Sequence, residues 1–255
     1  HRQRTHSEKM LLRQNKIFYG WFVVIGAVLV SFGVAGGQFS FGVFLKPMTA
    51  EFGWSRGTLS LAFGTTFMIS GLLRPLAGYL ADRYSPKIAV LSGVAVMGTM
   101  LLFTPFIQNL AQLFVIFAIM SIGITLGTGP IMTKVISAWF YTRRGLTMGL
   151  VSGASSFGAM VLVPSTSAFL VLGDWKQGYW FLGVLLLALV LPVGYMLIRN
   201  RPGEVGMEPY GGSSEGPGSD RESAVQRQTL FGRDAGFREA VTSPLFAKLT
   251  LGYFV

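Results

Sequence analysis

Residues 17–45 read IFYGWFVVIGAVLVSFGVAGGQFSFGVFL and contain no charged side chain. Five further apolar stretches cover residues 59–80, 88–107, 113–140, 146–172 and 179–198. A helix that crosses the ~30 Å hydrocarbon layer of a bilayer needs about 20 largely apolar residues. A water-soluble core does not require helices of this length and uniformity. The sequence therefore predicts an all-α integral membrane protein that crosses the bilayer six times.

Glycine is unusually frequent, with 33 residues out of 255, or about 13%, against ~7% in average proteins. In a bilayer, close backbone approach replaces the hydrophobic effect as the force that packs helices together. We therefore expect some of the spans to touch through glycine.

The basic residues of the chain, which carries a net charge of +10, are unevenly distributed about the predicted spans. If the N-terminus is cytoplasmic, the inner segments hold 15 Lys and Arg residues, whereas the outer loops hold only Lys46, Arg56 and Lys176. An excess of positive charge on the cytoplasmic side is the rule in membrane proteins. It predicts a cytoplasmic N-terminus in the plasma membrane, and it explains the basicity without a nucleic-acid partner.

The polar segments divide the chain into four predicted parts. These are a cytoplasmic leader (residues 1–16), the six-helix domain (17–198), a cytoplasmic linker (199–243) and the start of a seventh helix (244–255). The last 12 residues are apolar but too few to cross a bilayer, so we expect a second domain to begin there. Because the chain opens with His1, we expect it to be a piece of a longer protein.

A faint internal repeat relates the first three spans to the next three. RGTL at residues 56–59 introduces the second span, and RGLT at residues 144–147 introduces the fifth, 88 positions later. Pro75 in the second span and Pro164 in the fifth are 89 positions apart. Because three spans separate the copies, the second copy is inverted in the membrane. Inverted repeats of three helices are typical of transporters.

Arg74 and Lys134 are the two full charges inside the predicted spans. A charge at the bilayer centre costs at least ~2.5–3.5 kcal/mol and therefore usually faces a cavity or a partner. The six spans contain no Asp or Glu, so a cavity that holds both cations would favour an anion. Alternatively, both side chains could extend to the inner surface, because both lie near the inner ends of their spans.

Two uncharged residues, Gln38 and Thr128, are further candidate ligands. The GTGP segment at residues 127–130 loosens the fourth span beside Lys134 and lets polar backbone line a cavity. The predicted substrate-binding residues are thus Lys134, Arg74, Gln38 and Thr128. Hydrogen bonds that serve helix packing are the alternative for the two uncharged ones.

The predicted loop between the second and third spans reads GYLADRYSPK at residues 78–87. Asp82 could pair with a helix N-terminus or a basic partner and so hold the loop in place, while Arg83 and Lys87 remain at the basic surface. Gly78, just before the loop, permits two helices to approach closely. An ordinary cytoplasmic turn is the alternative. The segment resembles the loop 2–3 signature of the major facilitator superfamily, Gly-x-Leu-Ala-Asp-Arg-x-Gly-Arg/Lys-Arg/Lys, but has Ser85 and Pro86 in place of the second glycine and the first base. The matching residues are Gly78, Asp82, Arg83 and Lys87.

Four other segments are similar to motifs of one branch of that superfamily, the monocarboxylate porters and oxalate/formate antiporters. The longest is WFYTRRGLTMGLVSGASSFG at residues 139–158, which resembles the entrance of the fifth helix in that branch. The shorter ones are YGW at residues 19–21, FGWS at 52–55 and RPGEVG at 201–206.

The longest of these segments places three glycines on one helix face. Gly145, Gly149 and Gly153 recur every four residues and follow Arg143 and Arg144. In the resembled fold this helix borders the opposite domain, so the smooth face could slide during gating. Static packing inside the six-helix domain is the alternative.

The resemblance implies a twelve-helix fold built from inverted repeats, in which this chain supplies the N-terminal six helices and needs a C-terminal half as its partner. It also implies a secondary transporter that moves a small carboxylate by alternating access, with a proton or by exchange. The alternatives are a facilitator for a drug or a sugar, and a non-transporting membrane sensor or assembly partner.

The sequence contains no nucleotide-binding loop, catalytic dyad or cluster with metal-ligand spacing, and His1 and His6 lie in the leader. We therefore expect neither enzyme activity nor a cofactor or metal. The expected partners are a small anionic substrate, protons, the lipid bilayer and the missing half.

Overall fold

The computed structural model describes residues 18–127, 129–172 and 174–211. These residues form six helical spans of membrane length. Span 1 consists of α2 (Gly20–Phe39) and α3 (Phe41–Phe52), and span 2 is α4 (Arg56–Arg83). Span 3 is α5 (Pro86–Phe103) with the 3-10 turn η1 (Thr104–Phe106), and span 4 consists of α6 (Leu110–Gly127) and α7 (Pro130–Trp139). Span 5 is α8 (Arg144–Leu172), and span 6 consists of α9 (Trp175–Val184), the π-helix η2 (Leu185–Val190) and α10 (Leu191–Leu197). A 3-10 turn, η3 (Pro202–Val205), follows span 6. The predicted leader, the predicted seventh helix and the linker beyond Gly211 lie outside the described residues.

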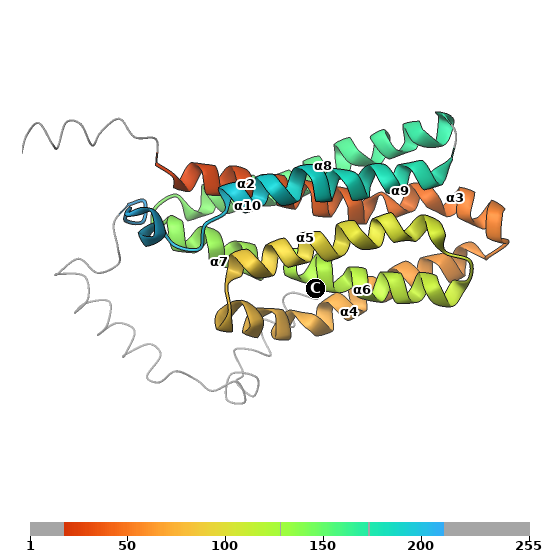
Figure 1. Ribbon diagram of the computed structural model, residues 1–255, viewed down its shortest axis with the longest axis horizontal. Coiled ribbons are helices and arrows are strands. Elements are labelled where there is room, and N and C mark those ends of the chain that lie inside the picture. The colour runs from red at the N-terminus through yellow and green to blue at the C-terminus, as the bar shows by residue number, and fades with distance from the viewer. Residues whose placement is uncertain (1–17, 128, 173, 212–255) are drawn as a thin grey trace, which may run out of the picture. The chain divides into compact units, whose positions relative to one another are not determined.

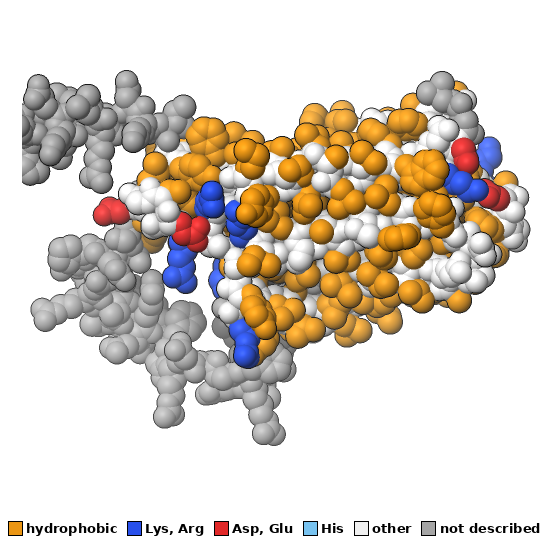
Figure 2. Space-filling view, viewed as in Figure 1, with side chains coloured by type: hydrophobic (Ala, Val, Ile, Leu, Met, Phe, Trp, Pro, Cys, Tyr) orange, Lys and Arg blue, Asp and Glu red, His pale blue; other side chains and the backbone are white. Residues whose placement is uncertain are grey.

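The six spans lie side by side and run along the long axis of this unit (Figure 1). On the visible face, apolar side chains cover the middle, and charged side chains gather near the two ends (Figure 2). We call one of these the basic end. It is formed by the end of span 2, the start of span 3, the turn from span 4 to span 5 and the end of span 6, with Arg83, Lys87, Arg143, Arg144 and Arg199. An apolar belt between charged ends suits a bilayer, and the six membrane-length helices confirm the predicted all-α integral membrane protein.

Local caps move several span ends away from their predicted positions. Span 1 continues past residue 45 and ends at Gly53, whose positive φ of 69° stops the helix. Span 2 starts before residue 59 because Ser55 Oγ accepts a hydrogen bond from the backbone N–H of Thr58 (3.0 Å). Span 6 starts before residue 179 because the Asp174 carboxylate caps its first turn. The hydrophobicity of the sequence alone does not predict where these caps begin or end a helix.

The helix pairing follows the predicted inverted repeat. Span 1 packs along span 5, and span 2 packs along span 4. If spans 1, 2 and 3 correspond to spans 4, 5 and 6, these two pairs are equivalent. Pro75 and Pro164 also lie at comparable places, each inside an uninterrupted helix of its repeat.

Spans 3 and 4 meet through a pair of glycines. A Cβ atom added to Gly93 would lie 2.7 Å from the carbonyl oxygen of Gly123, and one added to Gly123 would lie 2.7 Å from the carbonyl oxygen of Gly93. No side chain fits such a gap, so the two backbones touch. This contact confirms the expectation that glycine brings spans together.

At the basic end, the last turn of span 6 is held by side chains from three other spans. The carbonyl groups at a helix C-terminus lack partners within the helix. Here two of them accept hydrogen bonds, Tyr195 O from Lys87 Nζ (2.7 Å) and Met196 O from Tyr19 Oη (3.1 Å), and just beyond the helix Arg199 O accepts one from Trp139 Nε1 (2.9 Å). The donors belong to spans 3, 1 and 4, so these bonds join four spans at this end.

The residues after span 6 fold back onto the same end. Tyr210 N donates to Trp139 O (2.8 Å), and Tyr210 O accepts from Tyr141 N (3.0 Å) and Thr142 N (3.2 Å). The Tyr210 ring packs on the rings of Phe18 and Phe140. We call residues 199–211 the strap. The first part of the predicted linker is therefore docked on the six-helix unit.

Spans 1 and 6 are also joined at the opposite end. Trp175 Nε1 donates to the carboxylate of Glu51, and Lys176 Nζ lies 3.0 Å from the other oxygen of that carboxylate. Glu51 belongs to the last turn of α3, although the sequence places it in a loop.

Candidate substrate site at the break in span 4

Span 4 is interrupted where the sequence predicts a loosened helix. α6 ends at Gly127, and α7 begins at Pro130. Gly129 between them has φ 67° and ψ −128°, a backbone conformation open to glycine and strained for other residues. The first hydrogen bond of the new helix runs from Thr133 N to Gly129 O (3.1 Å). Thr128, one of the four predicted ligands, lies outside the described residues.

A pocket of about 100 Å³ opens beside this break. We call it the span 4 pocket. Spans 1, 4 and 5 line it with Ser31, Gly129, Met132, Thr133, Ile136, Met148, Val151, Ser152 and Ser155. About half of the lining is thus polar, and none of the lining residues is charged.

The four hydroxyl groups of the pocket differ in their hydrogen bonds. Thr133 Oγ1 donates to Gly129 O (3.2 Å), and Ser155 Oγ lies 3.5 Å from Val151 O. Ser31 is only 2% exposed, yet its hydroxyl has no hydrogen-bond partner among the described residues. The hydroxyl of Ser152, on the exposed side of α8, likewise has none there. These serines are not evident from the sequence, because a lone serine in an apolar helix does not indicate what faces it.

The break places the N-terminus of α7 at the pocket wall. The first N–H groups of a helix lack partners within it, and their aligned dipoles give this terminus a partial positive charge. Pro130, the first residue of α7, has no backbone N–H group, so its position leaves no unpaired donor. Lys134, which directly follows the lining residue Thr133, has an exposed side chain and adds a full positive charge to this helix. The arrangement is suited to an anion.

The other predicted ligands lie elsewhere. Arg74 is exposed on α4, and Gln38 is half-buried near the end of α2. Neither of them lines the span 4 pocket, and Lys134, although it is next to the lining residue Thr133 in the chain, does not line it either. Their roles in substrate binding stay predictions.

The loop between spans 2 and 3 differs from its expected arrangement at two residues. Lys87 is buried, and its ammonium group lies over the Tyr195 ring (4.4 Å) besides bonding that residue's carbonyl, whereas the sequence places it at the surface. Gly78 has open space where a Cβ would lie, so no described helix approaches it closely. Arg83 is exposed and donates to Tyr79 Oη (2.9 Å). The side chain of Asp82 lies outside the described residues.

Two arginines at the start of span 5, Arg143 just before it and Arg144 as its first residue, stabilise the turn from span 4. Arg143 has a positive φ of 64°, and its guanidinium lies over the Tyr210 ring of the strap (5.6 Å). Arg144 Nε donates to Phe140 O (2.7 Å) and its Nη2 to Ser137 O (3.2 Å), which caps the end of α7.

The glycine face of span 5 is open. A Cβ added to Gly145, Gly149 or Gly153 would meet nothing within 4 Å. Static packing against a described helix, the alternative considered for these glycines, is therefore not observed. The face is free to meet a partner.

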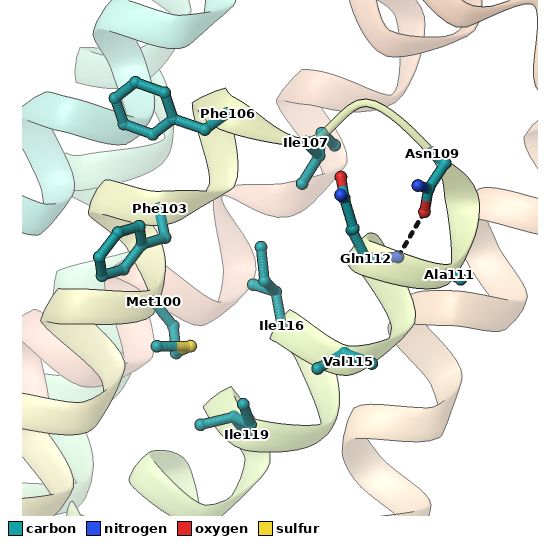
Figure 3. A pocket seen from close by; sticks show the side chains of 10 residues that line it. All are labelled: Met100, Phe103, Phe106, Ile107, Asn109, Ala111, Gln112, Val115, Ile116 and Ile119. Atoms are coloured by element: carbon teal, nitrogen blue, oxygen red, sulfur yellow. Dashed lines mark hydrogen bonds between the residues drawn. The ribbon is translucent and has the colours of Figure 1, made fainter.

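A second and larger hollow, of about 570 Å³, lies between span 3 and α6 near the end opposite the basic end (Figure 3). Its walls are apolar except for Asn109 and Gln112. Asn109 Oδ1 caps α6 by accepting a hydrogen bond from Gln112 N (2.9 Å), as Figure 3 shows. Its largely apolar walls distinguish this hollow from the span 4 pocket, where hydroxyl groups make up much of the lining.

Comparison with known families agrees with this arrangement of six spans. The model of the Major Facilitator Superfamily matches residues 27–255. The chain belongs to the major facilitator superfamily. The fold is accordingly the N-terminal six-helix half of that family's architecture, and the family is one of transporters and not of enzymes.

Several curated members of the superfamily are similar to this chain. They include an uncharacterised MFS-type transporter, YcxA, of Bacillus subtilis (26% identical over 71% of this chain and 45% of the relative), the oxalate:formate antiporter of Oxalobacter formigenes (23%, 73% and 44%) and human monocarboxylate transporter 1 (28%, 69% and 36%). The chain thus spans less than half the length of these relatives.

Proposed function

We propose that this chain is the N-terminal half of a secondary transporter that moves a small carboxylate across the membrane by alternating access. The observation that carries the proposal is the broken span 4, where the N-terminus of α7 and hydroxyl groups line a pocket and Lys134 adds a positive charge to the same helix. Two relatives are named as an oxalate:formate antiporter and a monocarboxylate transporter, and these names support the same substrate class.

The second half of the transporter is the proposed partner of the open helix faces. Besides the glycine face of span 5, Gly64 and Gly71 on span 2 have open space beside them. Spans 2 and 5 are equivalent in the inverted repeat, so a partner built on the same plan would meet both. Smooth glycine surfaces suit two domains that rock against one another about a central site.

We further propose that the basic end faces the cytoplasm and that the protein resides in the plasma membrane. The excess of Lys and Arg at this end supports that orientation. Substrate flux would then be coupled either to protons or to exchange of a second anion.

Uptake measurements on the full-length protein test this proposal. The protein is reconstituted in vesicles, and entry of labelled oxalate, formate, lactate and pyruvate is measured with and without a pH gradient or a preloaded anion. We expect saturable uptake of at least one of them. Uptake of other solutes only would refute the carboxylate assignment, and no flux at all in a folded protein would favour a sensor.

A charge-removal variant tests the role of Lys134. Lys134→Gln keeps a polar side chain of similar length but removes the positive charge, so we expect the KM for the carboxylate to rise about tenfold, as for loss of one charged hydrogen bond. Arg56→Gln, at an exposed position in the first turn of α4, is the matched control and should leave KM unchanged. Equal KM values for Lys134→Gln and the wild type would remove this residue from the site.

A further inference from the structure

The span 4 pocket contains two hydroxyl groups that no described residue satisfies. They belong to Ser31 on span 1 and Ser152 on span 5. Ser31 is 98% buried, being 2% exposed, and the pocket is the side from which a partner can reach it. Among the described residues, the fully buried hydroxyls without a partner are those of Thr66 and Tyr179, and that of Ser31 is not one of them, so the Ser31 hydroxyl keeps some access from the pocket. A ligand in the pocket that carries a hydrogen-bond acceptor could therefore accept hydrogen bonds from both hydroxyl groups.

The chemistry of the pocket selects an acceptor with negative charge. Its nine lining residues include neither Asp nor Glu. The hydroxyls of Thr133 and Ser155 already donate to Gly129 O and Val151 O, so those of Ser31 and Ser152 are left to donate. The N-terminus of α7, with ten residues a helix of nearly three turns, adds its partial positive charge on the same wall.

The volume of the pocket limits what it can hold. The span 4 pocket measures about 100 Å³, against about 570 Å³ for the apolar hollow between span 3 and α6. A carboxylate group and the carbon that bears it fit such a space, and the bulkier parts of a substrate would lie outside it.

We propose that Ser31 and Ser152 donate hydrogen bonds to the carboxylate of the transported substrate and seat it at the N-terminus of α7. This assignment rests on the proposed function, since it names the residues that select the substrate within a carboxylate transporter. The substrate class is acids of one to three carbons, such as formate, oxalate and lactate, whose remaining atoms extend out of the pocket.

Serine variants of the full-length protein in vesicles test the assignment. In Ser31→Ala and Ser152→Ala, loss of one hydrogen bond to a charged group should raise the KM for the carboxylate about tenfold or more. Ser152→Thr keeps the hydroxyl and should restore a KM near that of the wild type. Ser92→Ala is the matched control, because Ser92 Oγ bonds Ala89 O within its own helix and does not line the pocket.

The outcomes separate the two proposals. Carboxylate flux with wild-type KM in both alanine variants would overturn the serine site while leaving the carboxylate transporter intact. A wild-type protein that carries no carboxylate would overturn both. A raised KM in both variants together with rescue by threonine supports the site, because a merely structural loss would not be repaired by the hydroxyl.

Chemical protection provides a second measurement that does not depend on transport. The 255 residues contain no cysteine, so Ser152→Cys introduces a single thiol into this half. We expect oxalate or lactate to slow its reaction with a thiosulfonate reagent, and the neutral solute glycerol not to. Ser156→Cys, one turn along the exposed side of α8 and outside the pocket lining, should react equally with and without the acid. Equal reaction of the Ser152→Cys thiol under all conditions would overturn the assignment.

Discussion

At the residue scale, single polar side chains decide the chemistry and the stability of this unit. Lys134 stands out in the sequence because a charge in an apolar span is conspicuous. Ser31 and Ser152 do not, since serine is common in membrane helices and only the packing of spans 1, 4 and 5 brings them together. Lys87 was expected at the surface, but its position under Tyr195 depends on where span 6 ends. Sequence thus identifies conspicuous charges better than it identifies their partners.

The indole of Trp139 illustrates a residue whose contribution is structural. Its Nε1–H satisfies the carbonyl of Arg199, so Trp139→Phe should leave that carbonyl without a partner and lower the free energy of unfolding by about 1–2 kcal/mol. Thermal unfolding in detergent measures the change. Trp180→Phe, at an exposed tryptophan on α9, is the control and should have little effect. A Trp139→Phe protein as stable as the wild type would show that water replaces the indole.

At the scale of single helices, the existence of all six spans could be predicted from apolar length alone, and so could the weak point in span 4. The ends of the spans could not, because they are set by short polar caps such as Ser55 and Asp174. The π-helix within span 6 was also missed. It directly precedes α10, whose second residue is Pro192, and a proline cannot donate the hydrogen bond that would continue a regular helix.

The Gly93 and Gly123 contact gives a test at this scale. Gly123→Ala places a methyl group 2.7 Å from the carbonyl oxygen of Gly93 and should force spans 3 and 4 apart, at a cost of about 1–3 kcal/mol in unfolding free energy. Gly42→Ala, where the added methyl meets nothing within 4 Å, should be neutral or stabilising by up to about 1 kcal/mol. The comparison is made by thermal unfolding of both variants. The same loss of stability in both would mean that helix contact is not the cause.

At the scale of the whole molecule, the family could be inferred from a few short segments, and the comparison with known families confirms it. The structure adds a relation that the sequence does not contain. Three of the segments that suggested the carboxylate branch, at residues 19–21, 139–158 and 201–206, come from distant parts of the chain and belong to spans or the strap that meet at the basic end. Their proximity depends on the packing of spans 1, 4 and 6, which no local pattern encodes.

The open face of span 5 gives a prediction for the complete transporter. Gly149→Leu adds a side chain where the described unit has free space, so its effect on stability should stay within about 0.5 kcal/mol. In the full-length protein we expect the same variant to reduce the rate of transport, because the added bulk meets the second half. Ala111→Leu, exposed in the apolar hollow between span 3 and α6, is the matched control and should transport normally. Normal transport by Gly149→Leu would exclude this face from the domain interface.

The docked strap has a practical consequence for engineering this protein. A carrier can be divided into two separately expressed pieces, or tagged between them, directly after its sixth hydrophobic segment. Here a cut at that point would remove Tyr210 from its bonds with Trp139, Tyr141 and Thr142 and take away the cover of the span 4 to span 5 turn. A cut after Gly211 keeps those bonds within one piece, and so defines the shortest N-terminal fragment that retains its own closing contacts.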